Sequence, residues 1–150
     1  MEADRTRTAE HEAKEKLVTE LVKRNDFEVP EALVERQIDL RLERGLRALA
    51  AQGMRAEDIK KMDFNRLRAG QREQAVQEVK ASLLLEKIAD QEKIAVPDEE
   101  VEREIEALAT QSKQTVEEIR ARLTRDGAVD RIRNRIRSEK TLDFLYHQSA

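Results

Sequence analysis

Cysteine is absent from this 150-residue chain, so the sequence excludes disulfide bonds, thiolate metal sites and cysteine nucleophiles. Aromatic residues are scarce, with three Phe, one Tyr and no Trp. The longest run of large apolar residues is Leu83–Leu85, far below the roughly 18 residues that span a bilayer. The first 16 residues are charged throughout, unlike a secretory signal peptide. These features favour a cytoplasmic protein that makes no membrane contact.

No catalytic or cofactor-binding motif can be recognised. The four glycines are isolated, so there is no phosphate-binding loop and no sign of an ATP-driven mechanism. His11 and His147 lie in strongly charged segments, which favours exposed helix residues over metal ligands. Glu99 and Glu100 fall in a first helical turn, where they suit the helix dipole better than acid–base catalysis. We therefore expect no enzyme activity, no catalytic residue, no metal and no cofactor.

Charge is abundant but balanced. Charged residues make up 41% of the chain, yet the formal net charge is only -3, which argues against a dedicated nucleic-acid binder. Ala, Glu, Lys, Leu and Arg together exceed half of the residues, a composition typical of long helices. Leu, Ile, Val and Phe total 36 residues, which is little for the compact core of a chain of this length. We predict an all-α, elongated fold with thin local cores.

Apolar spacing and capping residues predict six helices. The residues that begin or end them are Pro30 and Pro97 at first turns, a Thr115–Glu118 capping box, Asp63 as an N-cap, and Gly53 and Gly127 at C-terminal ends. No segment alternates with period two for long enough to form a strand. Residues 54–62 are expected to form a short irregular link. The helices are expected at about 5–24, 30–52 and 63–92, from 97 through at least 108, and at about 115–127 and 129–147.

Arginine is concentrated in one region. Residues 120–137 hold seven arginines and two aspartates, whereas residues 98–106 hold six acids and one arginine. Arg131 to Arg137 alternate at i, i+2, which spreads them around a helix, and no aromatics interleave for base stacking. We interpret this region as a solvated face with ion pairs to the acidic helix, and not as a nucleic-acid site. A further interpretation is that these polar side chains line a surface that binds unfolded polypeptides, called guest chains below.

Four apolar residues cluster in the link between the second and third predicted helices, where a polar turn would be usual. They are Met54, Ile59, Met62 and Phe64. One interpretation is a small satellite core. The other is an exposed apolar patch that contacts partners, with methionine supplying adaptability. The sequence leaves both open.

Three stretches resemble the C-terminal domain of bacterial trigger factor. They are NDFEVPEALVERQ at Asn25–Gln37, LLLEKIADQEKIAVPDEEVEREIEAL at Leu83–Leu108, and IRSEKTLDFL at Ile136–Leu145. The last third of the chain also resembles the helical core of SurA-type periplasmic chaperones, which share this architecture. The Asn25–Gln37 match favours trigger factor. Trigger factor is a family of ATP-independent chaperones that meet nascent chains at the ribosome.

The resemblance implies an elongated domain with two protruding helical arms that form a cradle. It implies one domain over residues 1–150, with a body at 1–45, a first-arm tip at about 46–67, a long central helix at 68–94, and the second arm and closing helix at 95–150. The ribosome-docking and prolyl isomerase domains of the full-length family are absent from this sequence. We therefore read the chain as one excised domain, which would reach the ribosome only through those other domains.

The function implied is binding of nascent or unfolded polypeptides through dispersed apolar and polar contacts, which prevents aggregation and aids folding. An alternative is a structural or assembly module that binds one folded partner or itself, and a homodimer is consistent with exposed arms. The residues expected to contact guest chains are Leu46, Leu49, Met54, Ile59, Met62, Phe64, Ile105, Leu108, Ile132 and Ile136. Some of them must instead hold the arms together.

Overall fold

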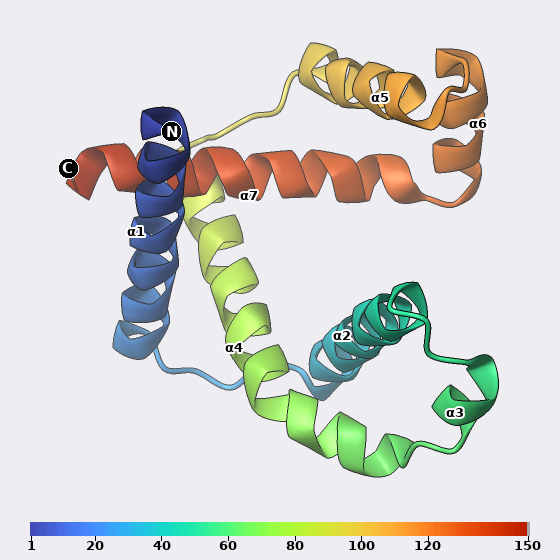
Figure 1. Ribbon diagram of the computed structural model, residues 1–150. Helices are drawn as coiled ribbons and strands as arrows, with labels where there is room; N and C mark the ends of the chain where they lie inside the picture. Colours follow the sequence, from blue (N-terminus) through green and yellow to red (C-terminus); the bar gives the residue numbers. More distant parts are fainter. Residues whose placement is uncertain (150) are drawn as a thin grey trace. The chain divides into compact units, whose positions relative to one another are not determined.

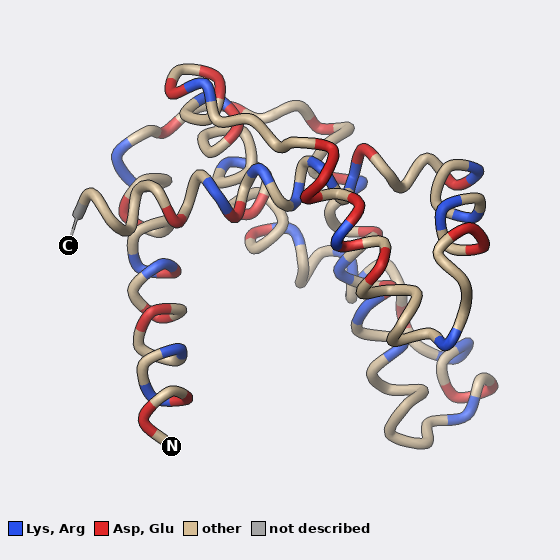
Figure 2. The backbone as a smooth tube through the Cα atoms, turned by 90° about the horizontal axis from the view of Figure 1, so that it is seen from above, with Lys and Arg blue, Asp and Glu red and all other residues tan. Residues whose placement is uncertain are grey.

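The computed structural model describes residues 1–149 and confirms the all-α prediction, with no strand among those residues. Figure 1 traces the helices along the chain, and Figure 2 shows both signs of charge along them, as the small net charge requires. Their bounds follow the predicted capping residues closely. They are α1 (Glu2–Arg24), α2 (Glu31–Ala51), α3 (Ala56–Lys60), α4 (Phe64–Gln91), α5 (Asp98–Ser112), α6 (Val116–Arg125) and α7 (Ala128–Ser149).

The prediction of an irregular link at residues 54–62 was wrong, because this segment contains the short helix α3. The amides of Asp58 and Ile59 donate to the carbonyl of Arg55 at 3.0 and 3.1 Å, which closes one helical turn. Glu57 and Asp58 lie in its first turn and Lys60 in its last, each at the end that the helix dipole favours. Apolar periodicity could not reveal this helix, because its five residues include only one large apolar side chain, Ile59.

The chain divides into two compact units. Unit 1 contains residues 1–17 and the described residues from Leu85 onward, and unit 2 contains Val18–Leu84. Helices α1 and α4 each contribute to both units. The predicted arms, the cradle and the four-part division of residues 1–150 stay predictions.

The core of unit 1 lies among α5, α6 and α7. Val101, Ile105 and Ala109 form a buried stripe on α5 at i, i+4, i+8 spacing, which is one face of a helix. Ile119 of α6 is fully buried and Ile136 of α7 is 8% exposed. These five residues form one cluster. The half-buried residues that pack against it are Val96, Leu108, Val116, Leu123, Val129 and Ile132.

Ion pairs join the same three helices, as the arginine-rich region predicted. Arg133 pairs with Asp98 at 2.6 Å and Arg135 with Glu104 at 3.0 Å. Arg120 of α6 pairs with Glu102. The interpretation of residues 120–137 as a face that pairs with the acidic helix is therefore confirmed.

The connection between α4 and α5 is held by side chains of α7. Arg137 Nε donates to the carbonyl of Ile94 at 2.8 Å, and Lys140 Nζ donates to the carbonyl of Ala95 at 2.9 Å. The guanidinium of Arg137 also pairs with Asp90 at 2.8 Å. The backbone of this connection is thus tied to a helix of unit 1.

Unit 2 is built around α2 and α4. Val34, Ile38 and Ala75 form its buried cluster, and Ala75 has no exposed area. Ion pairs extend the contact on both sides of this cluster. Those between α2 and α4 join Glu31 to Arg72, Glu35 to Arg68 and Arg72, Asp39 to Arg68, and Arg41 to Glu78.

Capping fixes the ends of the helices. Thr115 Oγ1 accepts from the Glu118 amide at 3.2 Å, and the Thr115 amide donates to the Glu118 carboxylate at 3.4 Å, which confirms the predicted capping box. After α5, Lys113 adopts φ 56°, and the Gln114 amide donates to the carbonyl of Ala109 at 3.0 Å. This left-handed position usually holds glycine, because a Cβ is strained there.

We predict that Lys113→Gly stabilises unit 1 by about 1 kcal/mol, because glycine adopts positive φ without steric cost. Lys87→Gly is the matched control, because Lys87 is exposed within α4. This substitution should lower the free energy of unfolding by about 0.5–1 kcal/mol. Urea unfolding followed by far-UV circular dichroism measures both. Equal effects of the two substitutions would contradict the left-handed strain at Lys113.

Candidate functional site

Unit 2 contains a long segment without a core. Among described residues 39–74 none is buried, although nine large apolar side chains lie there. Ile38 and Ala75, which flank the segment, are 2% and 0% exposed. We call these nine residues the apolar surface. They are Leu40, Leu42, Leu46, Leu49, Met54, Ile59, Met62, Phe64 and Leu67.

The apolar surface is accessible to different degrees. Leu40, Met54 and Phe64 are exposed, at 41%, 37% and 38%. The other six, Leu46, Leu49, Ile59 and Met62 among them, are half-buried. Leu42, at the edge of this surface, packs against the buried cluster of the unit. A satellite core would bury at least one of its members, and none is buried. The structure therefore favours the exposed-patch interpretation of Met54, Ile59, Met62 and Phe64.

Backbone geometry holds this surface in place. Gly53 follows α2 with φ 97°, its amide donates to the carbonyl of Ala50 at 3.1 Å, and the Met54 amide donates to that of Leu49 at 3.0 Å. These bonds form a Schellman motif, which commonly brings the flanking apolar side chains together. At the start of α4, Asp63 Oδ1 accepts from the Arg66 amide at 3.2 Å, as predicted for an N-cap. Met54 is thereby fixed beside the end of α2.

The four candidates in unit 1 have a packing role. Ile105 and Ile136 belong to the buried cluster of this unit, and Leu108 and Ile132 pack against it. Ile105 is 2% exposed, so it offers almost no area to another chain. We leave Ile105 and Ile136 out of the proposed binding surface for this reason. Periodicity identified the apolar face of each helix but could not show that another helix covers it.

Sequence analysis did not select Leu40, the most exposed of the nine. The sequence did indicate its exposure. Leu40 lies two residues after Ile38, so it falls on the opposite face of α2 from the stripe of Val34, Ile38 and Leu42. A large apolar residue that departs from the buried stripe of its helix is a candidate contact residue.

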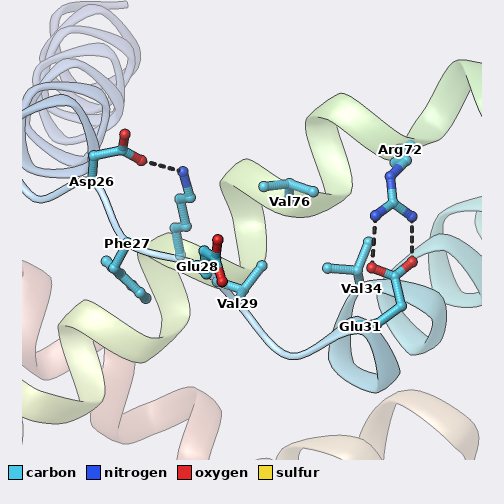
Figure 3. A pocket seen from close by; sticks show the side chains of 9 residues that line it. Asp26, Phe27, Glu28, Val29, Glu31, Val34, Arg72 and Val76 are labelled. Atoms are coloured by element: carbon cyan, nitrogen blue, oxygen red, sulfur yellow. Dashed lines mark hydrogen bonds and ion pairs between the residues drawn. The ribbon is translucent and has the colours of Figure 1, made fainter.

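A second feature of unit 2 is a hollow of about 620 Å³ between α4 and the connection from α1 to α2. Figure 3 shows Asp26 at one side of it and the Glu31–Arg72 pair at the other, with Val29 and Val76 between. Asp26 pairs there with Lys80. Val29 and Val76 also pack against the core of the unit. The residues that line the hollow are Asp26, Phe27, Glu28, Val29, Glu31, Val34, Arg72, Val76 and Lys80.

The two ion pairs shift the pKa values of their groups. Lys80 Nζ donates to Asp26 Oδ1 at 2.9 Å, and this hydrogen bond lowers the pKa of Asp26. Arg72 makes two hydrogen bonds to Glu31, at 2.5 and 2.7 Å, which lower the pKa of Glu31 and raise that of Arg72. The hollow is therefore flanked by charges that satisfy each other at neutral pH.

Within residues 1–149, no group of three or more His, Asp or Glu side chains is placed to hold a metal ion. No helix of that range is both long and apolar enough to cross a bilayer. What the two features offer is apolar area, with polar groups at its edges.

Comparison with known proteins identifies the family. The family model described as "Bacterial trigger factor protein (TF) C-terminus" matches residues 1–147. The trigger factor of Koribacter versatilis (strain Ellin345) is 66% identical over 149 residues, which are 99% of this chain and 34% of that protein. The trigger factor of Solibacter usitatus (strain Ellin6076) is 43% identical over 141 residues, covering 94% of this chain and 33% of that protein.

A solved structure has the same fold. It is described as "Structures of and interactions between domains of trigger factor from Themotoga maritim", and it is similar with a TM-score of 0.65 and 23% identity, over 92% of this chain and 81% of that chain. The chain spans about a third of the length of the curated relatives it matches. These findings confirm the resemblance to trigger factor and favour it over the SurA-type alternative.

We predict that acid destabilises unit 2. The pKa values of Asp26 and Glu31 are lowered by folding, so the stability they contribute is present above their unfolded values of about 3.8 and 4.5 and is lost as the pH falls through the folded values. Urea unfolding between about pH 5 and pH 3 should show this loss, and Asp26→Asn with Glu31→Gln should reduce it.

Glu73→Gln, at an exposed position of α4, is the matched control and should leave the pH dependence of the unfolding free energy unchanged. If the Asp26 and Glu31 variant loses as much stability in acid as the parent chain, these ion pairs do not stabilise the unit.

Proposed function

Because this chain belongs to the family of the bacterial trigger factor C-terminus, we propose that it is a chaperone domain that binds nascent or unfolded polypeptides. Binding occurs through dispersed apolar and polar contacts and prevents the guest chain from aggregating while it folds. The domain acts without catalysis and without ATP. Family membership supports the chaperone role, and the apolar surface of unit 2 supports its assignment to particular residues.

One observation carries the assignment. Residues 39–74 keep nine large apolar side chains, three of them exposed and none buried, and exposed apolar side chains that gather in one region mark candidate binding sites. Two methionines, Met54 and Met62, belong to this surface. Their unbranched side chains can adapt to guests of different shape. Such a surface suits many guests better than a single folded partner.

The strength of each contact explains why no energy source is needed. Partial burial of one Leu, Ile or Met against a guest is worth about 1–2 kcal/mol. Several such contacts on one guest chain add through effective concentration. Each contact can also break singly, so the guest can leave as its own apolar residues become buried. The ion pairs of α2 and α4 keep the unit folded while its apolar side chains stay accessible.

Other parts of the proposal follow from the family. We propose that the domain works in the cytoplasm, and that contact with the ribosome depends on parts of the relatives outside the matched third. Self-association of the domain is a further proposal, and a structural module that binds one folded partner is the competing function.

We predict that this chain suppresses aggregation of a denatured client protein on dilution, with equal effect in the presence and absence of ATP. Replacing Met54, Ile59 and Met62 by Ser should raise the concentration for half-maximal suppression by at least about tenfold, because three apolar contacts are lost. Light scattering measures the suppression, and far-UV circular dichroism measures the helix content.

Glu57→Ser with Lys60→Ser is the matched control, because it changes the same segment, keeps the apolar surface and leaves the net charge at -3. It should retain the suppression. Absence of suppression by the parent chain at several-fold excess would contradict the chaperone proposal. Reduced helix content in the Met54, Ile59 and Met62 variant would show that these residues stabilise the fold.

A further inference from the structure

We propose that the connection between α1 and α2 is a second guest site of unit 2, where an extended guest segment pairs with the backbone of Glu28 or of Val29, which face opposite edges of the connection. An apolar side chain of the guest enters the hollow beside Val29 and Val76. The inference rests on the proposed chaperone function and deepens it, since it names the conformation and the chemical class of the guest segment.

The first argument is the state of the backbone. Among the described residues, no backbone hydrogen bond is recorded for the amide or carbonyl of Glu28 or Val29. The connection between α4 and α5 differs, because Arg137 and Lys140 bond the carbonyls of Ile94 and Ala95. No backbone partner therefore competes with a guest for the amide and carbonyl of either residue, and one guest strand would use those of one residue. An extended chain supplies complementary groups by adding as a strand.

The second argument is conformation. Pro30 has φ -59° and ψ 132°, which is an extended geometry. Val29 precedes this proline, and sterics restrict such a residue to the extended regions. The segment is thus held extended by local chemistry, so it would lose little conformational freedom when a strand pairs with it. A helical guest could not use these groups, because its own backbone bonds are internal.

The third argument is the hollow itself. Its volume of about 620 Å³ lies in the range of about 300–1,000 Å³ that is usual for ligand pockets. Val29 and Val76 present apolar area to it, and both rest on the core of Val34, Ile38 and Ala75. A branched aliphatic side chain of the guest would bury its surface there, directly beside the backbone that pairs with the guest.

Charge determines which side chains fit. The lysine and the arginine that line the hollow are already paired, Lys80 with Asp26 and Arg72 with Glu31. An acidic guest side chain would lose water there and find both cations occupied. An uncharged aliphatic side chain carries no such penalty. Because Glu28 also lines the hollow, the site disfavours acidic guest segments and accepts apolar ones.

The test is a titration of the whole chain, labelled with ¹⁵N, with the blocked tetrapeptide acetyl-Gly-Leu-Leu-Gly-amide. We expect shifts of the amide signals of Phe27, Glu28, Val29 and Val76. A peptide of the same sequence with methylated leucine amide nitrogens keeps both leucine side chains but lacks their two N–H donors. It should bind about three- to tenfold more weakly at this site, because hydrogen bonds to the connection are lost. Equal binding of the two peptides would overturn backbone pairing.

A variant tests the hollow separately. Val76→Phe fills the space with a larger apolar side chain and should reduce peptide binding at the connection at least about fivefold. The matched control Ala69→Phe enlarges an exposed side chain of α4 outside both the hollow and the apolar surface, and it should leave that binding unchanged. Should Val76→Phe unfold the unit, the comparison of the two peptides still decides the proposal.

The outcomes separate this inference from the proposed function. Peptide shifts confined to the apolar surface of residues 39–74, with none at residues 27–29, would overturn the second site and leave the chaperone proposal standing. Shifts at residues 27–29 in a chain that suppresses no aggregation would support peptide binding here and contradict the chaperone role.

Discussion

The small contact between α2 and α4 determines what unit 2 can do. Val34, Ile38 and Ala75 are buried, and from Ile38 to the end of α2 and on through α3 no further described residue is buried. The chain has too few large apolar residues to fill a core along this length, so ion pairs such as Glu31–Arg72 and Asp39–Arg68 supply the remaining contacts. Exposed ion pairs each contribute little, but they hold two helices together without covering the leucines and methionines beside them.

Much of the fold follows from the sequence, because helix ends depend on local chemistry. Asp63 and Thr115 stand directly before a helix, as predicted, whereas Pro30 and Pro97, predicted in first turns, occupy the N-cap position just before the helix. The short helix α3 was missed, since its five residues carry no apolar repeat. The candidate site was predicted less well. Ile105 and Leu46 have the same residue class and helical spacing, yet one is buried and the other half-exposed. What covers a helical face is a tertiary property, and sequence periodicity does not contain it.

The two features of unit 2 would act on different properties of a guest chain. The apolar surface offers adaptable side chains over a long segment and has no preference for a guest conformation. The connection before α2 offers backbone groups and a hollow, which favour an extended guest. Non-native chains have both properties, exposed apolar side chains and unpaired backbone, whereas a folded protein has neither in quantity. A guest that folds would therefore lose its contacts with both features.

The most direct test follows methyl groups of the chain by NMR while an unfolded client protein is added. The methyl signals of Met54, Ile59 and Met62 lie on the apolar surface and should shift or broaden. Those of Ile105, Ile119 and Ile136 lie in the core of unit 1 and should not change. A response of the core isoleucines without a response of Met54, Ile59 and Met62 would contradict the claim that unit 2 keeps uncovered apolar side chains for guest chains.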